Sequence, residues 1–335
     1  MSPPADRHPP AGRVALPGVP AVALVLLLTL SLAACRGAGD PGPGSSPGSS
    51  PGSSPGSPAS SHPSPSLEPH VPHPGDDALV LRIEHRGGFV PDDFHLTRLP
   101  TFTLLGDGRV IVTGAVPAIY PGPLLPPLLE RHLTEAGVQA VIRAALDSGQ
   151  LDAHAEWRGA ANFVADASDT VFILDAAGGR VTVSVYALGL GEAGDWGLKK
   201  PERDAHEALL ELSGKLTALD SWLPASAWSD AGWQPYRADA LRLVVRPADG
   251  VAPGNDGLPL RIEAWPLPGD PAEFGERAQM PGWRCGVVTG ADAVAWYAAL
   301  DGADQLTRWE GGGHLYQVTP RPLLPDEPPE CGPLL

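Results

Sequence analysis

The sequence is poor in positive charge and in cysteine. Its 335 residues include 23 lysines and arginines against 39 aspartates and glutamates, which gives a net charge of −16 at pH 7. Such an acidic chain repels nucleic acid and anionic lipid head groups, so neither is expected as a direct partner. Only three cysteines are present, Cys35, Cys285 and Cys331, and none forms a CxxC pair. This spacing does not favour a cysteine zinc site or a catalytic thiol pair.

Common catalytic motifs are also missing. The sequence contains no His-Glu-x-x-His motif, no Ser-x-x-Lys with its supporting boxes and no P-loop. Residues 189–194 match the dinucleotide-binding glycine pattern, but no helix is expected at the last glycine and Glu192 would repel a pyrophosphate. We therefore favour a plain loop there. No cofactor and no metal are predicted, and we favour a protein that is not an enzyme.

A hydrophobic run without charge occupies residues 14–32, after a start that carries two arginines. Pro17 and Pro20 interrupt its first half, which leaves a core of signal-peptide length rather than a membrane span. Residues 32–35, Leu-Ala-Ala-Cys, match the lipobox of bacterial lipoproteins, in which the cysteine is lipidated and becomes the first residue. We predict a signal peptide over residues 1–34 and a lipid anchor on Cys35 that holds the protein on the extracytoplasmic face of the cell membrane. The alternative is an ordinary signal peptide with an accidental cysteine.

Residues 35–77 are predicted to form a disordered tether that begins at the lipidated cysteine. They are rich in Gly, Pro and Ser and poor in apolar side chains, so they cannot bury enough surface to offset their conformational entropy. His62, His70 and His73 lie in this segment and could bind a metal loosely. We favour no metal there, because spaced histidines in a disordered tract lack the surrounding groups that orient real ligands.

The remaining residues are predicted to form an α+β fold, with one part over residues 78–235 and a C-terminal subdomain over residues 236–335. Hairpins are expected at residues 101–113 and 170–186, each followed by an amphipathic helix. The first helix should cover residues 135–147 with Thr134 as N-cap, and the second should begin at Pro201. This order, used twice, indicates an antiparallel sheet built from hairpins with helices packed on one face.

The last third should contain strands at residues 241–246, 260–265 and 315–318 and a helix at 291–300 that starts at Thr289. It also holds Cys285 and Cys331. In an exported chain, two remaining cysteines are best explained by one disulfide, which would hold the proline-rich end of the chain on the fold. A catalytic thiol or a metal site is the less favoured alternative.

Two acid–histidine segments are the remaining candidates for chemistry. Asp92 and His95 lie in one, and Asp152 and His154 in the other. If the fold brought them together they could form a metal or acid–base site, although we favour polar loops. Three tryptophans, Trp222, Trp228 and Trp233, could stack on a sugar or anchor a partner, but we favour a packing role in the seam between subdomains.

Several short motifs give the chain a resemblance to a known group of proteins. It resembles uncharacterised lipobox-containing surface lipoproteins of high-GC Gram-positive bacteria in Gly88-Phe89-Val90-Pro91, Leu99-Pro100-Thr101-Phe102-Thr103-Leu104, Gly106-Asp107-Gly108-Arg109-Val110, Tyr120-Pro121-Gly122-Pro123 and Arg321-Pro322-Leu323-Leu324-Pro325-Asp326. The resemblance implies a bacterial surface location and supplies no activity and no site residue.

Three functions are compatible with these features. We favour a non-catalytic module at the cell envelope that binds a protein, a peptide or a cell-wall glycan. The alternative is an envelope hydrolase or metal-dependent enzyme that uses Asp92, His95, Asp152 and His154. A transport-linked solute binder would need two α/β lobes around a cleft, and the order of hairpins and helices argues against it.

Overall fold

The computed structural model describes residues 69–191, 196–250, 257–278 and 280–332. The predicted signal peptide, Cys35, His62 and most of the predicted tether lie outside the described residues. Across the described ranges, no helix has both the length and the apolar character that crossing a membrane requires.

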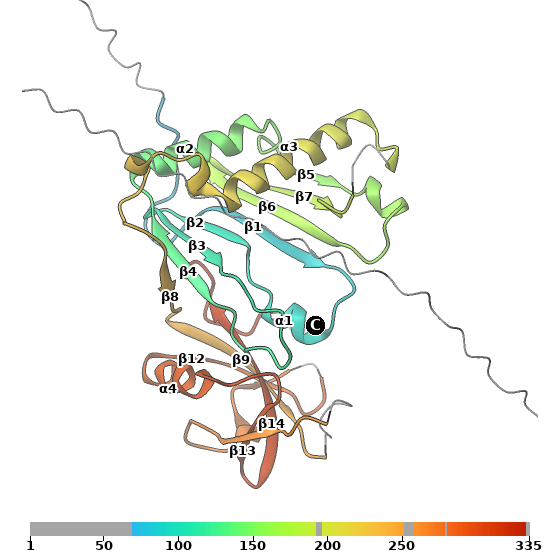
Figure 1. The fold of residues 1–335 in the computed structure, drawn as a ribbon, viewed down its shortest axis with the longest axis vertical. Coiled ribbons are helices and arrows are strands. Elements are labelled where there is room, and N and C mark those ends of the chain that lie inside the picture. The colour runs from blue at the N-terminus through green and yellow to red at the C-terminus, as the bar shows by residue number, and fades with distance from the viewer. Residues whose placement is uncertain (1–68, 192–195, 251–256, 279, 333–335) are drawn as a thin grey trace, which may run out of the picture. The chain divides into compact units, whose positions relative to one another are not determined.

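The chain from Leu79 to Tyr236 forms an eight-stranded sheet with its helices (Figure 1). Its strands are β1 (Leu79–Gly87), β2 (Phe102–Leu105), β3 (Arg109–Thr113), β4 (Leu128–His132), β5 (Ala155–Trp157), β6 (Ser168–Ala176), β7 (Gly179–Tyr186) and β8 (Gln234–Tyr236). The strand order is β5-β7-β6-β1-β2-β3-β4-β8, and every neighbouring pair is antiparallel except β5 and β7. The predicted hairpins are confirmed as β2–β3 and β6–β7, and β1 joins them by pairing with β2 and β6.

Helices α2 (Glu135–Asp147) and α3 (Lys200–Thr217) cover one face of this sheet (Figure 1). The hydroxyl of Thr134 accepts a hydrogen bond from the backbone N–H of Gly137, so the predicted N-cap of α2 is confirmed. The core between helices and sheet contains Val138, Val141 and Ile142 of α2, Leu209, Leu212 and Leu216 of α3, and Ile83, Phe102 and Phe172 of the strands. Helix α3 ends at Thr217, and Leu223 reaches the core from the turns that follow.

The last part of the chain forms a second sheet of six strands. Its strands are β9 (Ala240–Pro247), β10 (Arg261–Ala264), β11 (Glu276–Arg277), β12 (Arg284–Thr289), β13 (Thr307–Gly311) and β14 (His314–Leu323), in the order β10-β13-β14-β9-β12-β11. Helix α4 (Gly290–Leu300) packs its Trp296 against Trp309 of β13 in the core of this sheet. Thr289 is the N-cap residue of α4 as predicted, but its side chain makes no capping hydrogen bond.

Strand β14 is longer than predicted and contains Pro320 and Pro322. These prolines lie opposite Leu243 and Leu241 of β9, while β13 pairs only with the first residues of β14. Proline lacks a backbone N–H, so it is tolerated where one side of a strand has no ladder partner. Because proline is rare in strands, residue propensities alone did not predict the full length of β14.

The predicted α+β class, with antiparallel hairpins and helices on one sheet face, is confirmed. The predicted boundary between residues 235 and 236 falls inside β8, which pairs with β4 of the first sheet. The change from the first sheet to the second takes place in the short connection between Tyr236 and Ala240.

Each end of the described chain lies along the fold as an irregular segment. The N-terminal strap, residues 69–77, was expected to belong to the disordered tether, but Val71 packs against the core of the first sheet. The backbone N–H of Ala177 donates to the carbonyl of Pro72 at 2.8 Å, and that of Asp107 donates to the carbonyl of Asp76 at 2.8 Å. The tether prediction therefore extended too far, because proline-rich sequence also forms fixed extended segments when a fold supplies hydrogen-bond partners.

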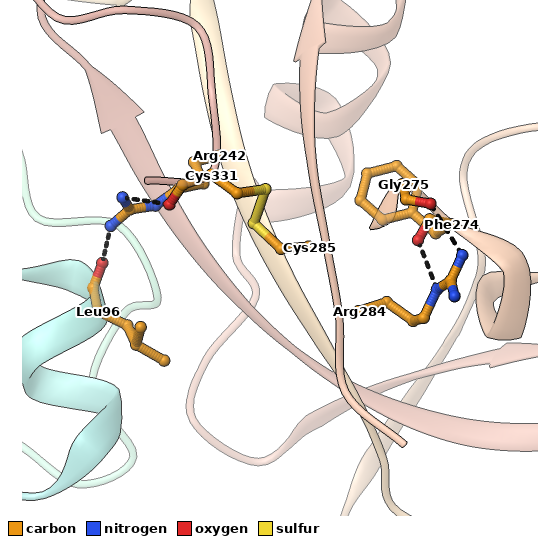
Figure 2. Close-up of a disulfide and its surroundings, with 7 residues drawn as sticks. All are labelled: Leu96, Arg242, Phe274, Gly275, Arg284, Cys285 and Cys331. Carbon is orange, nitrogen blue, oxygen red and sulfur yellow. Dashed lines mark hydrogen bonds between the residues drawn. A yellow bond between two sulfur atoms is a disulfide. The ribbon is translucent and has the colours of Figure 1, made fainter. Parts of the chain in front are cut away.

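The C-terminal strap, residues 324–332, is held by a disulfide between Cys285 of β12 and Cys331, as predicted (Figure 2). Both cysteines are buried beside Val244. Arg242 crosses between the strap and α1 (Asp92–Thr97), donating to the carbonyls of Cys331 at 3.2 Å and Leu96 at 2.7 Å. Burial and the neighbouring charge of Arg321 lower the pKa of Arg242 to about 10.

Candidate functional site

A hollow of about 490 Å³ lies over β4, β8 and the loop that precedes β8. It is lined by Glu130, His132, Ser229, Asp230, Ala231, Gly232 and Gln234. Its lining therefore combines two carboxylates, an imidazole, a hydroxyl and an amide. None of these residues was among the predicted site residues.

Pairing between the loop and β4 builds this hollow. The backbone N–H of Ser229 donates to the carbonyl of His132 at 3.0 Å, and Leu133 forms an isolated bridge with Trp228. Asp230 then accepts two hydrogen bonds from His132, one from its backbone N–H at 2.9 Å and one from Nδ1 at 2.7 Å. The loop is thereby fixed against the strand, so the acidic side chains have defined positions.

The electrostatics of the hollow are those of an anionic acceptor site. Hydrogen bonding from His132 holds the pKa of Asp230 below its ordinary value, so this carboxylate is ionised at neutral pH. Arg131 lies close by: it donates to the backbone carbonyl of Asp230 at 3.3 Å, stacks over the Trp228 ring at 3.9 Å and forms an ion pair with Asp220. Its charge also lowers the pKa of Asp230, so it offsets part of the negative charge of the hollow.

The hollow is not arranged as a serine triad. The hydroxyl of Ser229 donates to the backbone carbonyl of His132 at 3.2 Å rather than to its imidazole. A triad requires the nucleophile to be hydrogen-bonded to the base. The contacts of this serine are those of a residue that shapes the loop.

The structure does not bring the predicted acid–histidine residues together. Asp92 and His95 lie in α1, which follows β1. The side chain of Asp92 lies outside the described part of the chain. Asp152 and His154 precede β5 at the sheet edge, where the His154 Nδ1 accepts a hydrogen bond from the Thr182 N–H at 3.0 Å.

The register of the sheet explains this separation. β6 and β7 lie between β5 and β1, which separates those two strands by roughly 14 Å. Thr182 pairs with Ile173, which pairs with Arg82, so His154 lies level with the middle of β1, whereas α1 follows the far end of β1 at Gly87. The proposed hydrolase site using both segments has no support in this arrangement.

The three candidate tryptophans are packing residues rather than an exposed platform. Trp228 is buried in the core of the first sheet, and Trp222 and Trp233 pack partly buried against that core. The indole N–H of Trp233 donates to Asp220 at 2.8 Å, and that of Trp222 donates to the carbonyl of Lys215 at 2.9 Å. The expected packing role is confirmed, but it serves the first sheet and its helices instead of a seam between the two parts.

A second group of titratable side chains gathers where the N-terminal strap meets α2. Among the residues that the structure describes, His70, His73 and Glu135 form the one group of three histidine, cysteine or acidic side chains whose ligand atoms all lie within 4.8 Å of one another. The prediction of no metal site rested on the absence of supporting groups around these histidines. That premise was wrong for His70 and His73, because the strap is folded against the helix.

Comparison with known proteins adds no relative: no protein-family model, no curated protein and no solved structure matches this chain. The function is therefore argued from the residues and contacts described above.

Proposed function

We propose that this protein is a lipid-anchored lipoprotein of the extracytoplasmic membrane face and that its folded part is a non-catalytic binding module. The anchor is proposed on the sequence of residues 14–35, a charge-free hydrophobic run that ends in Leu-Ala-Ala-Cys. A diacylglyceryl group on Cys35 supplies the two acyl chains that stable attachment requires.

The hollow over β4 and β8 is the observation that carries the binding proposal. Its Glu130 and Asp230 carboxylates only accept hydrogen bonds, and the net charge of −16 attracts cations to the protein. These features favour a peptide or glycan ligand that bears ammonium groups. Because the hollow is open to solvent and carries carboxylates, we expect affinity that is modest and that falls as salt is raised.

A matched pair of variants tests the hollow. Asp249, in the turn after β9, contacts His314 much as Asp230 contacts His132, accepting from Nδ1 at 2.7 Å and from the backbone N–H of Leu315 at 2.8 Å. Asp230→Asn should weaken binding of a lysine pentapeptide about tenfold, or ~1.4 kcal/mol, whereas Asp249→Asn should leave it unchanged. Calorimetric titration of the protein from residue 36 onward measures both.

Three results would argue against a cation-binding hollow. They are an equal loss of affinity in the two variants, an unchanged affinity in both, and equal binding of a glutamate pentapeptide by the unmodified protein.

The anchor is tested separately by fractionating cells. Cys35→Ala should move the protein out of the membrane fraction or leave it unprocessed, because the thiol that carries the lipid is gone. The double variant Cys285→Ala/Cys331→Ala should stay in the membrane fraction, since neither cysteine is expected to carry lipid. If Cys35→Ala remains membrane-bound like the unmodified protein, the hydrophobic run itself is the anchor and the lipoprotein assignment is wrong.

A further inference from the structure

The N-terminal strap is fixed against α2 by paired hydrogen bonds. The Val71 N–H donates to Oε1 of Gln139 at 2.8 Å, and Nε2 of Gln139 donates back to the Val71 carbonyl at 2.9 Å. This two-way contact places the histidines on either side of Val71 and Pro72 over the first turn of the helix. His70 and His73 thereby meet Glu135, the first residue of α2.

The three side chains converge through potential ligand atoms. Nε2 of His70 lies 3.0 Å from Oε1 of Glu135, and Nε2 of His73 lies 3.3 Å from the same oxygen. In a tetrahedral zinc site with ordinary bond lengths, two ligand atoms lie about 3.3 Å apart. The separations between each histidine and Glu135 are therefore close to those of a bound site.

The hydrogen bonds of His73 leave no hydrogen on its Nε2, the ring nitrogen that faces Glu135. Nδ1 of His73 lies 2.6 Å from the carbonyl of Pro74. A carbonyl only accepts, so Nδ1 carries the hydrogen and Nε2 of the neutral ring presents a lone pair. That lone pair faces a carboxylate oxygen, which is favourable only if the ring gains a second proton or a cation lies between them.

Gln139 and His70 can satisfy the other acceptors of the cluster. The two hydrogens on Nε2 of Gln139 reach the Val71 carbonyl at 2.9 Å and Glu135 at 3.0 Å. In the tautomer with its hydrogen on Nε2, His70 donates to Glu135 at 3.0 Å. The lone pair without a hydrogen is therefore the one on Nε2 of His73, and a cation between it and Glu135 would correct this contact.

The electrostatic setting keeps the carboxylate ionised. Nε2 of Gln139 donates to Oε1 of Glu135 at 3.0 Å, and a hydrogen bond to the charged form favours the ionised carboxylate. The position of Glu135 in the first helical turn also favours negative charge. The side chain of His73 is 8% exposed, whereas those of His70 and Glu135 are 63% and 56% exposed, so an ion could enter from solvent and still have one sheltered ligand.

We propose that His70, His73 and Glu135 bind a divalent transition-metal ion of the zinc class. Imidazole nitrogen with one carboxylate is a donor set that suits zinc and its neighbours rather than magnesium or calcium. The hydrogen bond from His73 to Pro74 is of the kind that orients a metal-ligating imidazole. Three protein ligands leave a fourth position for water or an exogenous donor. The site shares no residue with the hollow, so it holds whether or not the proposed function does.

Metal binding would also act on the attachment of the strap. Two ligands belong to residues 69–77 and the third to α2, so the ion would crosslink the segment next to the predicted tether to the helix. The strap is otherwise held by Val71 and Gln139 at α2 and by backbone hydrogen bonds of Pro72 and Asp76 to the loops of the sheet. We therefore expect the ion to stabilise the strap more than the rest of the fold.

Zinc competition against a chromophoric chelator tests the proposal on untagged protein from residue 36 onward. The unmodified protein should bind one ion with a Kd in the micromolar range or below. His70→Ala, His73→Ala and Glu135→Gln should each weaken binding about 100-fold, and Gln139→Ala about tenfold.

The matched control is His314→Ala, which removes an exposed histidine that pairs with a single carboxylate, Asp249. This variant should bind zinc like the unmodified protein. The proposal is overturned if the unmodified protein binds no zinc at these concentrations, or if the ligand variants bind as well as His314→Ala. If the circular-dichroism spectrum of His73→Ala shows that this variant is unfolded, the zinc affinity of His70→Ala decides between the two outcomes, because His70 is exposed and its removal should leave the fold intact.

Discussion

The two straps at the ends of the described chain are held in different ways. The C-terminal strap has its charges matched: Arg82 donates to Asp326 at 2.6 Å, and Arg321 donates to both oxygens of Glu327 at 2.7 and 2.8 Å. A disulfide at Cys331 closes its far end. The N-terminal strap also has an ion pair, between Asp77 and Arg109, but its His73 presents a ring lone pair to Glu135.

This difference shows what each strap contributes. A strap with matched charges and a covalent crosslink is a permanent part of the fold. The N-terminal strap is held by hydrogen bonds, but its contact between His73 and Glu135 is favourable only with a cation between them, so this part of its attachment would respond to a metal ion. The predictions below test this contrast between a permanent and a conditional strap.

Loss of the disulfide should have the largest effect on stability. The bridge spans a sequence separation of 46 residues, and on the chain-entropy model such a loop contributes about 4 kcal/mol. We expect Cys285→Ala/Cys331→Ala to lower the free energy of unfolding by about that amount in urea denaturation. A loss below ~1 kcal/mol would mean that the C-terminal strap is held by its ion pairs alone.

Glu327→Gln should have the next largest effect. The side chains of Arg321 and Glu327 are 10% and 17% exposed, and the Leu324 N–H also donates to this carboxylate at 2.8 Å. Removing the negative charge leaves a buried guanidinium without its partner, which costs about 3 kcal/mol. The exposed Glu330 of the same strap gives the control, since Glu330→Gln should leave the free energy of unfolding nearly unchanged.

The two acids of this strap should also respond to pH in opposite directions. Burial raises the pKa of Glu327, but Arg321 outweighs it and holds the pKa below the ordinary value of 4.5. Its contribution to stability is thus full above pH 4.5 and is lost as pH falls through the folded-state pKa. At Asp326, burial outweighs Arg82 and raises the pKa, so acidification relieves a cost.

Acid denaturation of single variants separates these two contributions. Glu327→Gln should make the loss of stability between pH 5 and pH 3 shallower, and Asp326→Asn should make it steeper. The same direction of change in both variants would show that the two carboxylates titrate as one unit rather than as opposed groups.

Local sequence signals predicted much of the fold. Thr134 and Gly149 bound α2 as expected, with Gly149 at φ +66°, and the β2–β3 and β6–β7 hairpins follow the predicted alternation and turns. Pairings between strands that are far apart in the sequence were harder to predict. β1 joins the hairpins through pairing with residues far along the chain, and the prolines of β14 are tolerated only because of where that strand lies in its sheet.

The candidate sites were missed for the same reason. His132 and Asp230 are separated by 98 positions in the sequence, and His73 and Glu135 by 62. No pattern within a short stretch of sequence could therefore predict either contact. The acid–histidine segments that were chosen instead are contiguous in sequence but far apart across the sheet. The local sequence signal for the metal site was the pair His70 and His73, but its proline-rich surroundings favoured disorder. The structure shows that this segment is fixed by the hydrogen bonds between Val71 and Gln139 of α2.

Hydrogen exchange of two backbone amides, measured with and without zinc, tests the contrast between the straps most directly. The Val71 N–H donates to Gln139 in the N-terminal strap, and the Leu324 N–H donates to Glu327 in the C-terminal strap, both at 2.8 Å. We expect zinc to slow exchange at Val71 at least tenfold, to leave Leu324 unchanged, and to lose this effect in His70→Ala. Equal protection of both amides, or no change at Val71 with zinc in excess, would contradict the account.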